Sequence, residues 1–314
     1  GGERVDVTTL VGPDGDGHVY SPTPGDARTL AEADIIFKNG LLFEGWIDRL
    51  IEASGTEATV VAASDGIDAI PDAGHDQSHD DHGHSHGDSH GHSHGHSHGH
   101  GHGHSHGDSH GHSHSHDHSH SHSHDHGHSH GHDDHGHVHG DYDPHAWQDV
   151  GNVKVYVANI RDALIAKDPD GADLYSANAE AYIAELAALD AEIREAVAAL
   201  PEGALVITSH DAFRYFTHAY GLAFDAPVGT STEVEATARD VARLIETIRA
   251  NDIRAVFAES LTDARLIEQI AREAGVPVAG TLYSDALSPP DGPAGTYIDM
   301  MRHNISLISE GLGS

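Results

Sequence analysis

The chain has 314 residues and a formal net charge of −35, with 16 Lys and Arg residues against 51 Asp and Glu residues. A nucleic-acid-binding face needs clustered Lys and Arg, so we expect no nucleic-acid partner. The acidic field attracts cations, but a salty habitat explains the same composition as well as a functional role does. The absence of cysteine excludes disulfides, zinc–thiolate sites, thiol catalysis and a lipid-modified cysteine within this sequence.

The first residues, Gly1-Gly2-Glu3-Arg4, are neither a signal peptide nor an ordinary start. We therefore expect a processed N-terminus, with the signal peptide not present in this chain. No apolar run approaches the roughly 20 residues that are needed to span a bilayer.

The first part of the chain alternates short β-rich runs with segments of helical spacing. The expected elements are a strand over 5–11, a helix over 24–33, a strand over 35–37, a helix over 43–53 and a strand over 59–63. Such alternation is typical of parallel βαβ units.

Residues 72–141 are almost entirely His, Gly, Ser and Asp, and 29 of the 34 histidines lie from His75 to His139. This composition cannot form an apolar core, so we predict a disordered insertion. Expression tags are usually uninterrupted histidine runs, which favours a native segment. Without it, enough chain is left for two compact lobes.

After the tract, a helix is predicted over 146–167, and Pro169 and Gly171 break it. The next segment, 172–200, has apolar residues at steps of 4, 3, 4, 3 and 4, which mark one face of a helix about 40 Å long. The remaining expected elements are strands over 204–208, 222–226, 255–258 and 276–282 and helices over 211–220, 236–250, 264–274 and 295–312.

The predicted fold class is therefore α/β, with two lobes that each hold a mainly parallel sheet flanked by helices. The first lobe is expected over 1–171, the linking long helix over 172–200 and the second lobe over 201–314. A hinge of two or three crossing strands is the alternative to the long helix.

Four candidate metal ligands stand at comparable positions along the chain. His18 follows the turn after the first expected strand, His145 lies just before a helix, and His210 and Asp285 directly follow strands. Ligands bind beyond the carboxyl ends of parallel strands. Because two of these residues come from each lobe, they could close on one ion in the interlobe cleft.

Three imidazoles and one carboxylate suit tetrahedral Zn²⁺, whereas manganese sites depend more on oxygen ligands. Four protein ligands leave no position for a catalytic water, and the sequence has no His-Glu-x-x-His motif. The set therefore favours holding an ion, and we expect no enzymatic activity.

Other polar and aromatic residues near these positions have more than one interpretation. Glu259, at the end of a strand, could hydrogen-bond a ligating imidazole, but a helix cap or an interlobe contact fits equally well. His218 and His303 lie inside helical patterns and are interpreted as structural. Tyr20 and Trp147 are expected to pack the cleft without touching metal.

Four segments occur in a characteristic order. They are Asp-Gly-His-Val-Tyr-Ser-Pro at 16–22, Asp-Pro-His-Ala-Trp at 143–147, Thr-Ser-His-Asp-Ala-Phe-Arg-Tyr-Phe at 208–216 and Tyr-Ser-Asp-Ala-Leu-Ser at 283–288. Together they resemble the zinc-uptake (ZnuA-type) periplasmic solute-binding proteins of bacterial ABC importers, in the cluster A-I metal-binding family. The resemblance covers nearly the whole chain outside the tract.

The resemblance implies two α/β lobes bridged by a long helix and one interlobe Zn²⁺ site. The ligands that it implies are His18, His145, His210 and Asp285. It also implies a periplasmic location and delivery of zinc to an ABC permease; we expect a monomer, and whether a zinc metallochaperone loads the site is left open. The family normally has another strand and helix before the segment that matches Val5, which leaves the completeness of the first sheet open.

The histidine tract is expected to offer several weak, poorly selective zinc sites from His75 to His139. Its role is either an antenna or sensor for zinc beside the tight site, or a tolerated surface insertion. Near an unperturbed imidazole pKa of about 6.5, it would release metal as the pH falls.

Three rival functions remain open at this point. They are a metal store based on the tract, a metalloenzyme, and a transport protein for manganese, nickel or cobalt. For the zinc carrier we predict local loop movement more than a wide hinge swing, because the long helix limits opening.

Overall fold

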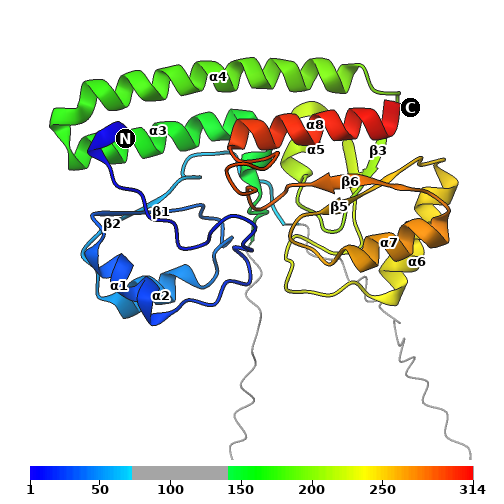
Figure 1. The fold of residues 1–314 in the computed structure, drawn as a ribbon, viewed down its shortest axis with the longest axis horizontal. Helices are drawn as coiled ribbons and strands as arrows, with labels where there is room; N and C mark the ends of the chain where they lie inside the picture. Colours follow the sequence, from blue (N-terminus) through cyan, green and yellow to red (C-terminus); the bar gives the residue numbers. More distant parts are fainter. Residues whose placement is uncertain (73–140, 314) are drawn as a thin grey trace, which may run out of the picture. The chain divides into compact units, whose positions relative to one another are not determined.

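The computed structural model describes residues 1–72 and 141–313, which belong to one compact unit (Figure 1). Except for its two end residues, the insertion predicted over 72–141 lies outside the described residues. The helices are η1 (Gly2–Arg4), α1 (Pro24–Glu32), α2 (Ile47–Ser54), η2 (Ala146–Gln148), α3 (Val150–Lys167), η3 (Pro169–Gly171), α4 (Ala172–Ala198), α5 (Arg214–Tyr220), α6 (Ala238–Ala250), α7 (Ala264–Ala274) and α8 (Tyr297–Gly313). The strands are β1 (Ile35–Lys38), β2 (Thr59–Ala62), β3 (Leu205–Ile207), β4 (Ala223–Asp225), β5 (Val256–Glu259) and β6 (Val278–Leu282).

The first lobe is built around one βαβ unit, in which β1 pairs in parallel with β2. Helix α1 starts at a capping box, since the Thr23 side chain accepts from the backbone of Asp26 and Asp26 accepts from the backbone of Thr23. Helices α1 and α2 pack on each other. The buried residues of this lobe's core are Leu30, Ile36, Trp46, Ile47 and Leu50.

The strand predicted over 5–11 is wrong. This segment forms no ladder with any described strand, and Val7 is 80% exposed. Leu10 and Val11 do pack against the core of the first lobe. The β-rich composition therefore reflects apolar contacts of an irregular segment, because a strand also needs a neighbour for its backbone groups.

The helix predicted over 43–53 begins later than expected. Residues 41–46 form turns, with Leu41 and Leu42 at φ values of 54° and 62°. A left-handed backbone at two successive leucines interrupts helical geometry. The helix therefore starts only at Ile47, and the turn before it places Phe43 in the interior, where it is 9% exposed.

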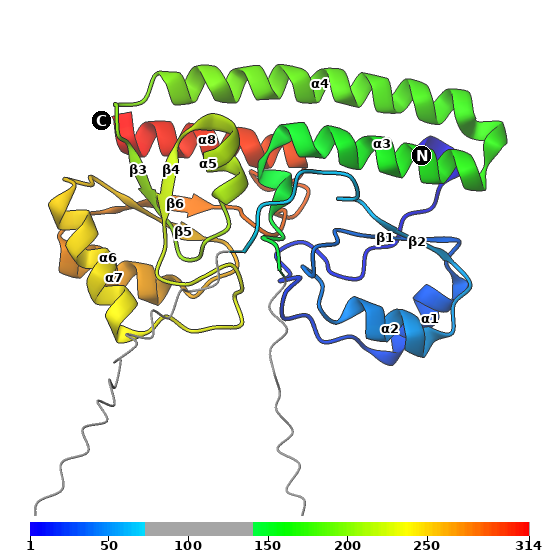
Figure 2. The ribbon, with the colours of Figure 1, turned by 180° about the vertical axis from the view of Figure 1, so that it is seen from behind.

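The predicted long helix is α4. Figures 1 and 2 show α3 antiparallel to α4 along one half of its length and α8 along the other half, both on the same side of α4, which agrees with its packing contacts. Leu186, Leu189 and Ile193 are fully buried on the face that the sequence spacing predicted. We propose that residues 172–200 link the two lobes. The start of α3 also contributes to the core beneath α4 and α8, through the buried Val150 and Val153.

The second lobe contains two parallel strand pairs, β3 with β4 and β5 with β6. Every described strand pair in the molecule is parallel, as the alternation of elements predicted, but each hydrogen-bonded sheet has only two strands. Helices α6 and α7 pack together over a core that includes Ile207, Leu244 and Ile267. No helix in the described ranges combines the length and apolar composition needed to cross a membrane.

Candidate metal centre

The four predicted residues come together at one place in the structure. His18, His145, His210 and Asp285 each offer one ligand atom, and these atoms all lie within 4.8 Å of one another. The Nε2 atoms of His18 and His145 are 3.4 Å apart. The side chains of His145, His210 and Asp285 are at most 1% exposed, and that of His18 is 7% exposed. The cluster is therefore almost completely shielded from water.

His145 is oriented by a carboxylate that precedes it by two residues. Asp143 Oδ1 accepts a hydrogen bond from the backbone N–H of His145 at 2.9 Å and lies 2.8 Å from its Nδ1. The ring is thereby fixed with Nε2 directed at the cluster. Sequence reasoning did not single out Asp143, although the Asp-x-His spacing was visible in the sequence.

His18 has the same local spacing but a different environment. Asp16 Oδ1 accepts from the backbone N–H of His18 at 2.8 Å. The ring packs edge-on against Phe43 at a centroid distance of 4.6 Å. The intervening residue, Gly17, lies so close to Phe43 that a Cβ at this position would meet the Phe43 ring at 2.6 Å. His18 is thus held by a loop and by an aromatic ring, not by regular structure.

His210 follows β3, where the carboxyl end of the strand places it beside Glu259 at the end of β5. Glu259 Oε1 accepts from the backbone N–H groups of Ser209 and His210 at 2.7 and 2.8 Å. Its other oxygen, Oε2, lies 2.7 Å from His210 Nδ1. One fully buried carboxylate therefore fixes both the backbone and the ring of His210.

Asp285 follows β6 and is the acceptor at the middle of the cluster. Its Oδ2 lies 3.0 Å from His210 Nε2, and its Oδ1 lies 3.4 Å from His145 Nε2. Neither oxygen has a hydrogen-bond partner of acceptable geometry within the described part of the chain. The imidazoles of His210 and His145 balance the charge of Asp285, but neither oxygen receives a well-directed hydrogen bond from the described residues, and a bound cation would satisfy both oxygens.

The loop that carries Asp285 is fixed to η2, the short helix that precedes α3. Trp147 Nε1 and Gln148 Nε2 both donate to the Ser284 carbonyl, at 2.8 and 3.1 Å. Trp147 also packs edge-on against the ring of His145 at 5.3 Å. His145 and Asp285 are therefore held together across the two lobes by contacts that do not depend on metal.

The electrostatic environment separates the three histidines. Burial lowers the pKa of His18 to about 4, although Asp285 raises it. Burial also lowers the pKa of His145 and His210, but nearby carboxylates outweigh it. Asp285 and Asp143 bring the pKa of His145 to about 9, and Glu259 and Asp285 hold the pKa of His210 well above its ordinary value. Burial raises the pKa of Asp285, but His210 and His145 hold it well below the usual range.

The other residues that the sequence singled out lie outside the cluster. His218 is exposed on α5, and His303 Nε2 lies 3.0 Å from the Thr281 carbonyl. Tyr20 donates to Asp26 and packs with a tilted ring against Trp46 in the first lobe. None of these side chains is among the candidate ligands.

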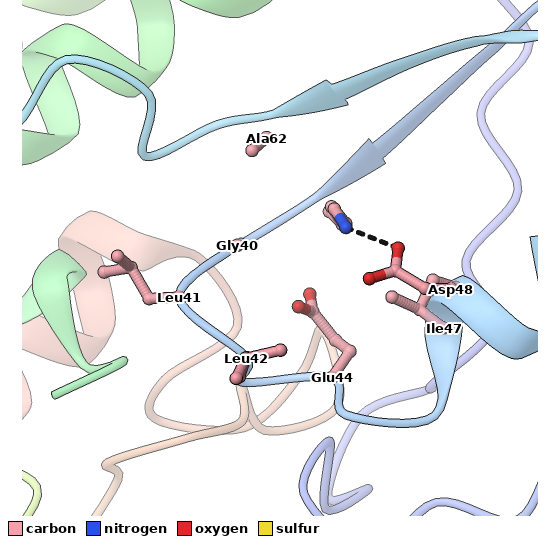
Figure 3. Close-up of a pocket in the computed structure, with 8 residues that line it drawn as sticks. Gly40, Leu41, Leu42, Glu44, Ile47, Asp48 and Ala62 are labelled. Atoms are coloured by element: carbon pink, nitrogen blue, oxygen red, sulfur yellow. Dashed lines mark hydrogen bonds and ion pairs between the residues drawn. The ribbon is translucent and has the colours of Figure 1, made fainter. Parts of the chain in front are cut away.

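A cavity of about 230 Å³ in the first lobe is separate from the cluster (Figure 3). It lies between β1, the turn that follows it and α2. A 2.5 Å ion pair between Lys38 and Asp48 crosses it. The lining contains no histidine, so this cavity offers no comparable metal site. Its lining residues are Lys38, Gly40, Leu41, Leu42, Glu44, Ile47, Asp48 and Ala62.

The fold and the imidazole–carboxylate cluster are those of a metal-binding solute-binding protein. The chain belongs to the zinc-uptake complex component A periplasmic (ZnuA) family, which it matches over residues 1–311. It is a substrate-binding component of metal ABC transporters and not an enzyme.

Two curated relatives are similar over almost the whole chain. The manganese-binding lipoprotein MntA of Halalkalibacterium halodurans is 31% identical over 312 residues, which cover 99% of this chain and 82% of MntA. The metal ABC transporter substrate-binding lipoprotein SsaB of Streptococcus sanguinis is 27% identical, with coverage of 99% and 83%.

Two solved structures share the fold. The periplasmic zinc binding protein TroA of Treponema pallidum has 26% identity and a TM-score of 0.70, covering 96% of this chain and 89% of TroA. A Mn-bound periplasmic metal binding protein of Candidatus Liberibacter asiaticus has 24% identity and a TM-score of 0.71, with coverage of 99% and 92%. The predicted fold class and family are thus confirmed.

Proposed function

We propose that this protein captures Zn²⁺ outside the cytoplasm and delivers it to an ABC permease, with His18, His145, His210 and Asp285 as the ligands. The observation that carries the proposal is the buried carboxylate of Asp285. Both of its oxygens lack a hydrogen-bond partner in the described chain, and the Nε2 atoms of three histidines surround it. A divalent cation would balance that charge and be coordinated by all four ligand atoms.

Zinc is favoured over manganese by the chemistry of the donors. Three imidazole nitrogens and one carboxylate suit Zn²⁺, while Mn²⁺ prefers oxygen-rich sites. Asp143 and Glu259 also hold the Nδ1 atoms of His145 and His210, which makes the opposite nitrogens more basic. The curated relatives are named for manganese, for iron or for metal in general, and TroA is named for zinc, so the names alone do not choose the ion.

The partner and location follow from the relatives' names as part of the same proposal. MntA and SsaB are named as lipoproteins, and SsaB as a metal ABC transporter substrate-binding lipoprotein. These names support an extracytoplasmic location and a membrane permease as partner. We further propose that the protein acts as a monomer, and a zinc metallochaperone is a candidate donor of the ion.

We propose that the tract from His75 to His139 is an auxiliary, low-affinity zinc collector or sensor. The residues that flank it support a connection to the tight site. The backbone of Asp72 donates to the Asp141 carbonyl at 3.0 Å, and that of Asp143 donates to the Ile70 carbonyl at 2.9 Å. The chain after the tract is therefore held from Asp141 onward, four residues before His145.

Competitive titration tests the proposed function. Zn²⁺ and Mn²⁺ would be titrated against a chelator of known affinity into the full chain and into a variant lacking residues 75–139. We expect one tight zinc per chain in both proteins, weaker manganese binding, and loss of the tight site in His145→Ala. His303→Ala, which alters a histidine outside the cluster, is the matched control. Manganese binding as tight as zinc binding, or a tight site that survives His145→Ala, would overturn the proposal.

A further inference from the structure

We propose that residues 228–232, the connection that follows β4, form a clasp in which the hydroxyls of Thr230 and Thr232 hold the first-lobe ligands His18 and His145 against His210 of the second lobe. The inference rests on the proposed function, because it concerns retention of the bound ion. Both threonines are positioning residues, since neither is a candidate ligand.

The clasp starts directly beside a candidate ligand of the second lobe. Val228 forms a parallel bridge with His210, and the backbone N–H of Asp211 donates to the carbonyls of Val228 and Gly229 at 3.1 and 3.2 Å. Movement of the clasp is therefore coupled to the backbone that carries His210.

Thr232 joins the clasp to His18. Its hydroxyl donates to Asp16 Oδ2 at 2.7 Å. The other oxygen of the same carboxylate accepts from the backbone N–H of His18 at 2.8 Å. One carboxylate thus connects the second lobe to the loop that presents His18.

Thr230 makes the corresponding contact on the side of His145. Its hydroxyl donates to Asp72 Oδ2 at 3.0 Å. The backbone N–H of Asp72 donates a hydrogen bond to the Asp141 carbonyl. Asp143, two residues after Asp141, orients the His145 ring. Arg214 of α5 also reaches the Asp72 carboxylate, at 3.4 Å. The Thr232 contact therefore has less support from neighbouring groups than the Thr230 contact.

A second set of contacts joins the lobes through the loop that carries Asp285, and these contacts are firmer than those of the clasp. Trp147 and Gln148 donate to the Ser284 carbonyl, and the backbone of Asp14 donates to the Leu287 carbonyl at 3.0 Å. The clasp, by comparison, consists of two side-chain hydroxyls on a segment without regular structure. Opening at the clasp would separate His18 from His210 and leave His145 beside Asp285. This geometry makes the clasp the side from which the ion leaves.

The chain offers matched variants for a test on the full-length protein. Thr→Val at 230 or 232 keeps the shape and removes the hydroxyl, and Thr232→Ser restores it. Ser231→Ala is the control, because among the described residues the Ser231 hydroxyl accepts from the backbone N–H of the nearby Glu233 and makes no hydrogen bond with the first lobe. Each protein would be loaded with one equivalent of zinc and mixed with excess chelator, and the release rate would be measured.

A hydrogen bond to a charged group contributes enough free energy to change a rate constant by about tenfold. We expect Thr232→Val to release zinc about tenfold faster, Thr230→Val to have a smaller effect, and the double variant to be fastest. Thr232→Ser and Ser231→Ala should stay within about twofold of the unmodified protein. Release from Thr232→Val at the unmodified rate, or equal acceleration by Ser231→Ala, would overturn the clasp.

Amide hydrogen exchange separates this inference from the proposed function. In the metal-free protein, Thr232→Val should speed exchange at the His18 amide, which bonds to Asp16, and leave the amides of β5 unchanged. Unchanged exchange at His18 would contradict the clasp even if zinc binds. A chain that binds no zinc but shows this local change would contradict the proposed function and retain the clasp as a contact between lobes.

Discussion

The two lobes hold their candidate ligands by different means. In the second lobe, His210 and Asp285 follow parallel strands, and the buried Glu259 at the end of a third strand fixes the ring of His210. In the first lobe, His18 lies in an irregular segment and His145 at the start of a 3₁₀ turn, and each depends on an aspartate two residues earlier. A carboxylate therefore orients a histidine in each lobe, but in the second lobe it comes from the end of another strand, whereas in the first lobe it comes from the same short segment as the ligand.

We expect the largest loss of zinc affinity from a change at Asp285. Asp285→Asn removes the one negative charge among the candidate ligands and leaves an amide against three imidazoles. Loss of one partner from a buried charged pair costs about 3–5 kcal/mol, so zinc affinity should fall by about two to four orders of magnitude. Competitive titration measures this change, with the exposed Asp291→Asn as control. Retention of affinity within about tenfold would place the ion elsewhere.

Variants of Asp143 and Glu259 test whether the histidine of each lobe depends equally on the carboxylate that orients its ring. Asp143→Asn and Glu259→Gln each remove a charge from behind a ligating imidazole, and such changes typically cost 10–100-fold in affinity. We expect losses of about this size for both variants in the same titration. An unchanged affinity for Glu259→Gln would show that the strand-end position alone orients His210.

Proton release on zinc binding sharpens the contrast among the histidines. With a pKa of about 9 for His145 and a raised pKa for His210, we expect both rings to be imidazolium cations at pH 7 in the metal-free protein, and we expect His18, with a pKa lowered to about 4, to be neutral. Because zinc binds only neutral imidazole, binding must displace those protons, and affinity must rise with pH through neutrality. Calorimetry in buffers of different ionisation enthalpy should give about two protons released per zinc. A value near zero would contradict the charge assignment.

The smallest expected effect concerns the loop that presents His18. In Gly17→Ala the new Cβ would meet the Phe43 ring at 2.6 Å, while Gly12→Ala in the same segment has open space. Overpacking of this kind costs about 1–3 kcal/mol. Thermal unfolding of the metal-free protein should show a lower melting temperature for Gly17→Ala than for Gly12→Ala. Equal melting temperatures would show that the Phe43 contact does not hold the loop.

Local sequence signals predicted most of the fold. Helical periodicity located α4, and the parallel pairing followed from the alternation of strands and helices. The strand expected over 5–11 failed because composition reports the preference of a segment but not the presence of a neighbouring strand. The left-handed Leu41 and Leu42 escaped notice because neither residue type signals that backbone conformation.

His145, His210 and Asp285 could be named from the sequence because each lies at the start or end of a predicted element that the structure contains. His18 was placed after a strand that the structure does not contain, and the resemblance of its segment to the family is what identified it. Asp143 was missed, although its spacing to His145 repeats that of Asp16 to His18. The contacts of Thr230 and Thr232 could not have been predicted. They join residues more than 150 positions apart in the chain, and such pairs are set by tertiary packing.

X-ray absorption at the zinc edge, on the full chain loaded with one equivalent of zinc, would show directly which atoms bind the ion. We expect three imidazole nitrogens and one carboxylate oxygen at about 2.0–2.2 Å. We also expect that Asp285→Asn alters this shell while Asp291→Asn does not. A shell made only of imidazoles, or one that Asp285→Asn leaves unchanged, would contradict this set of ligands.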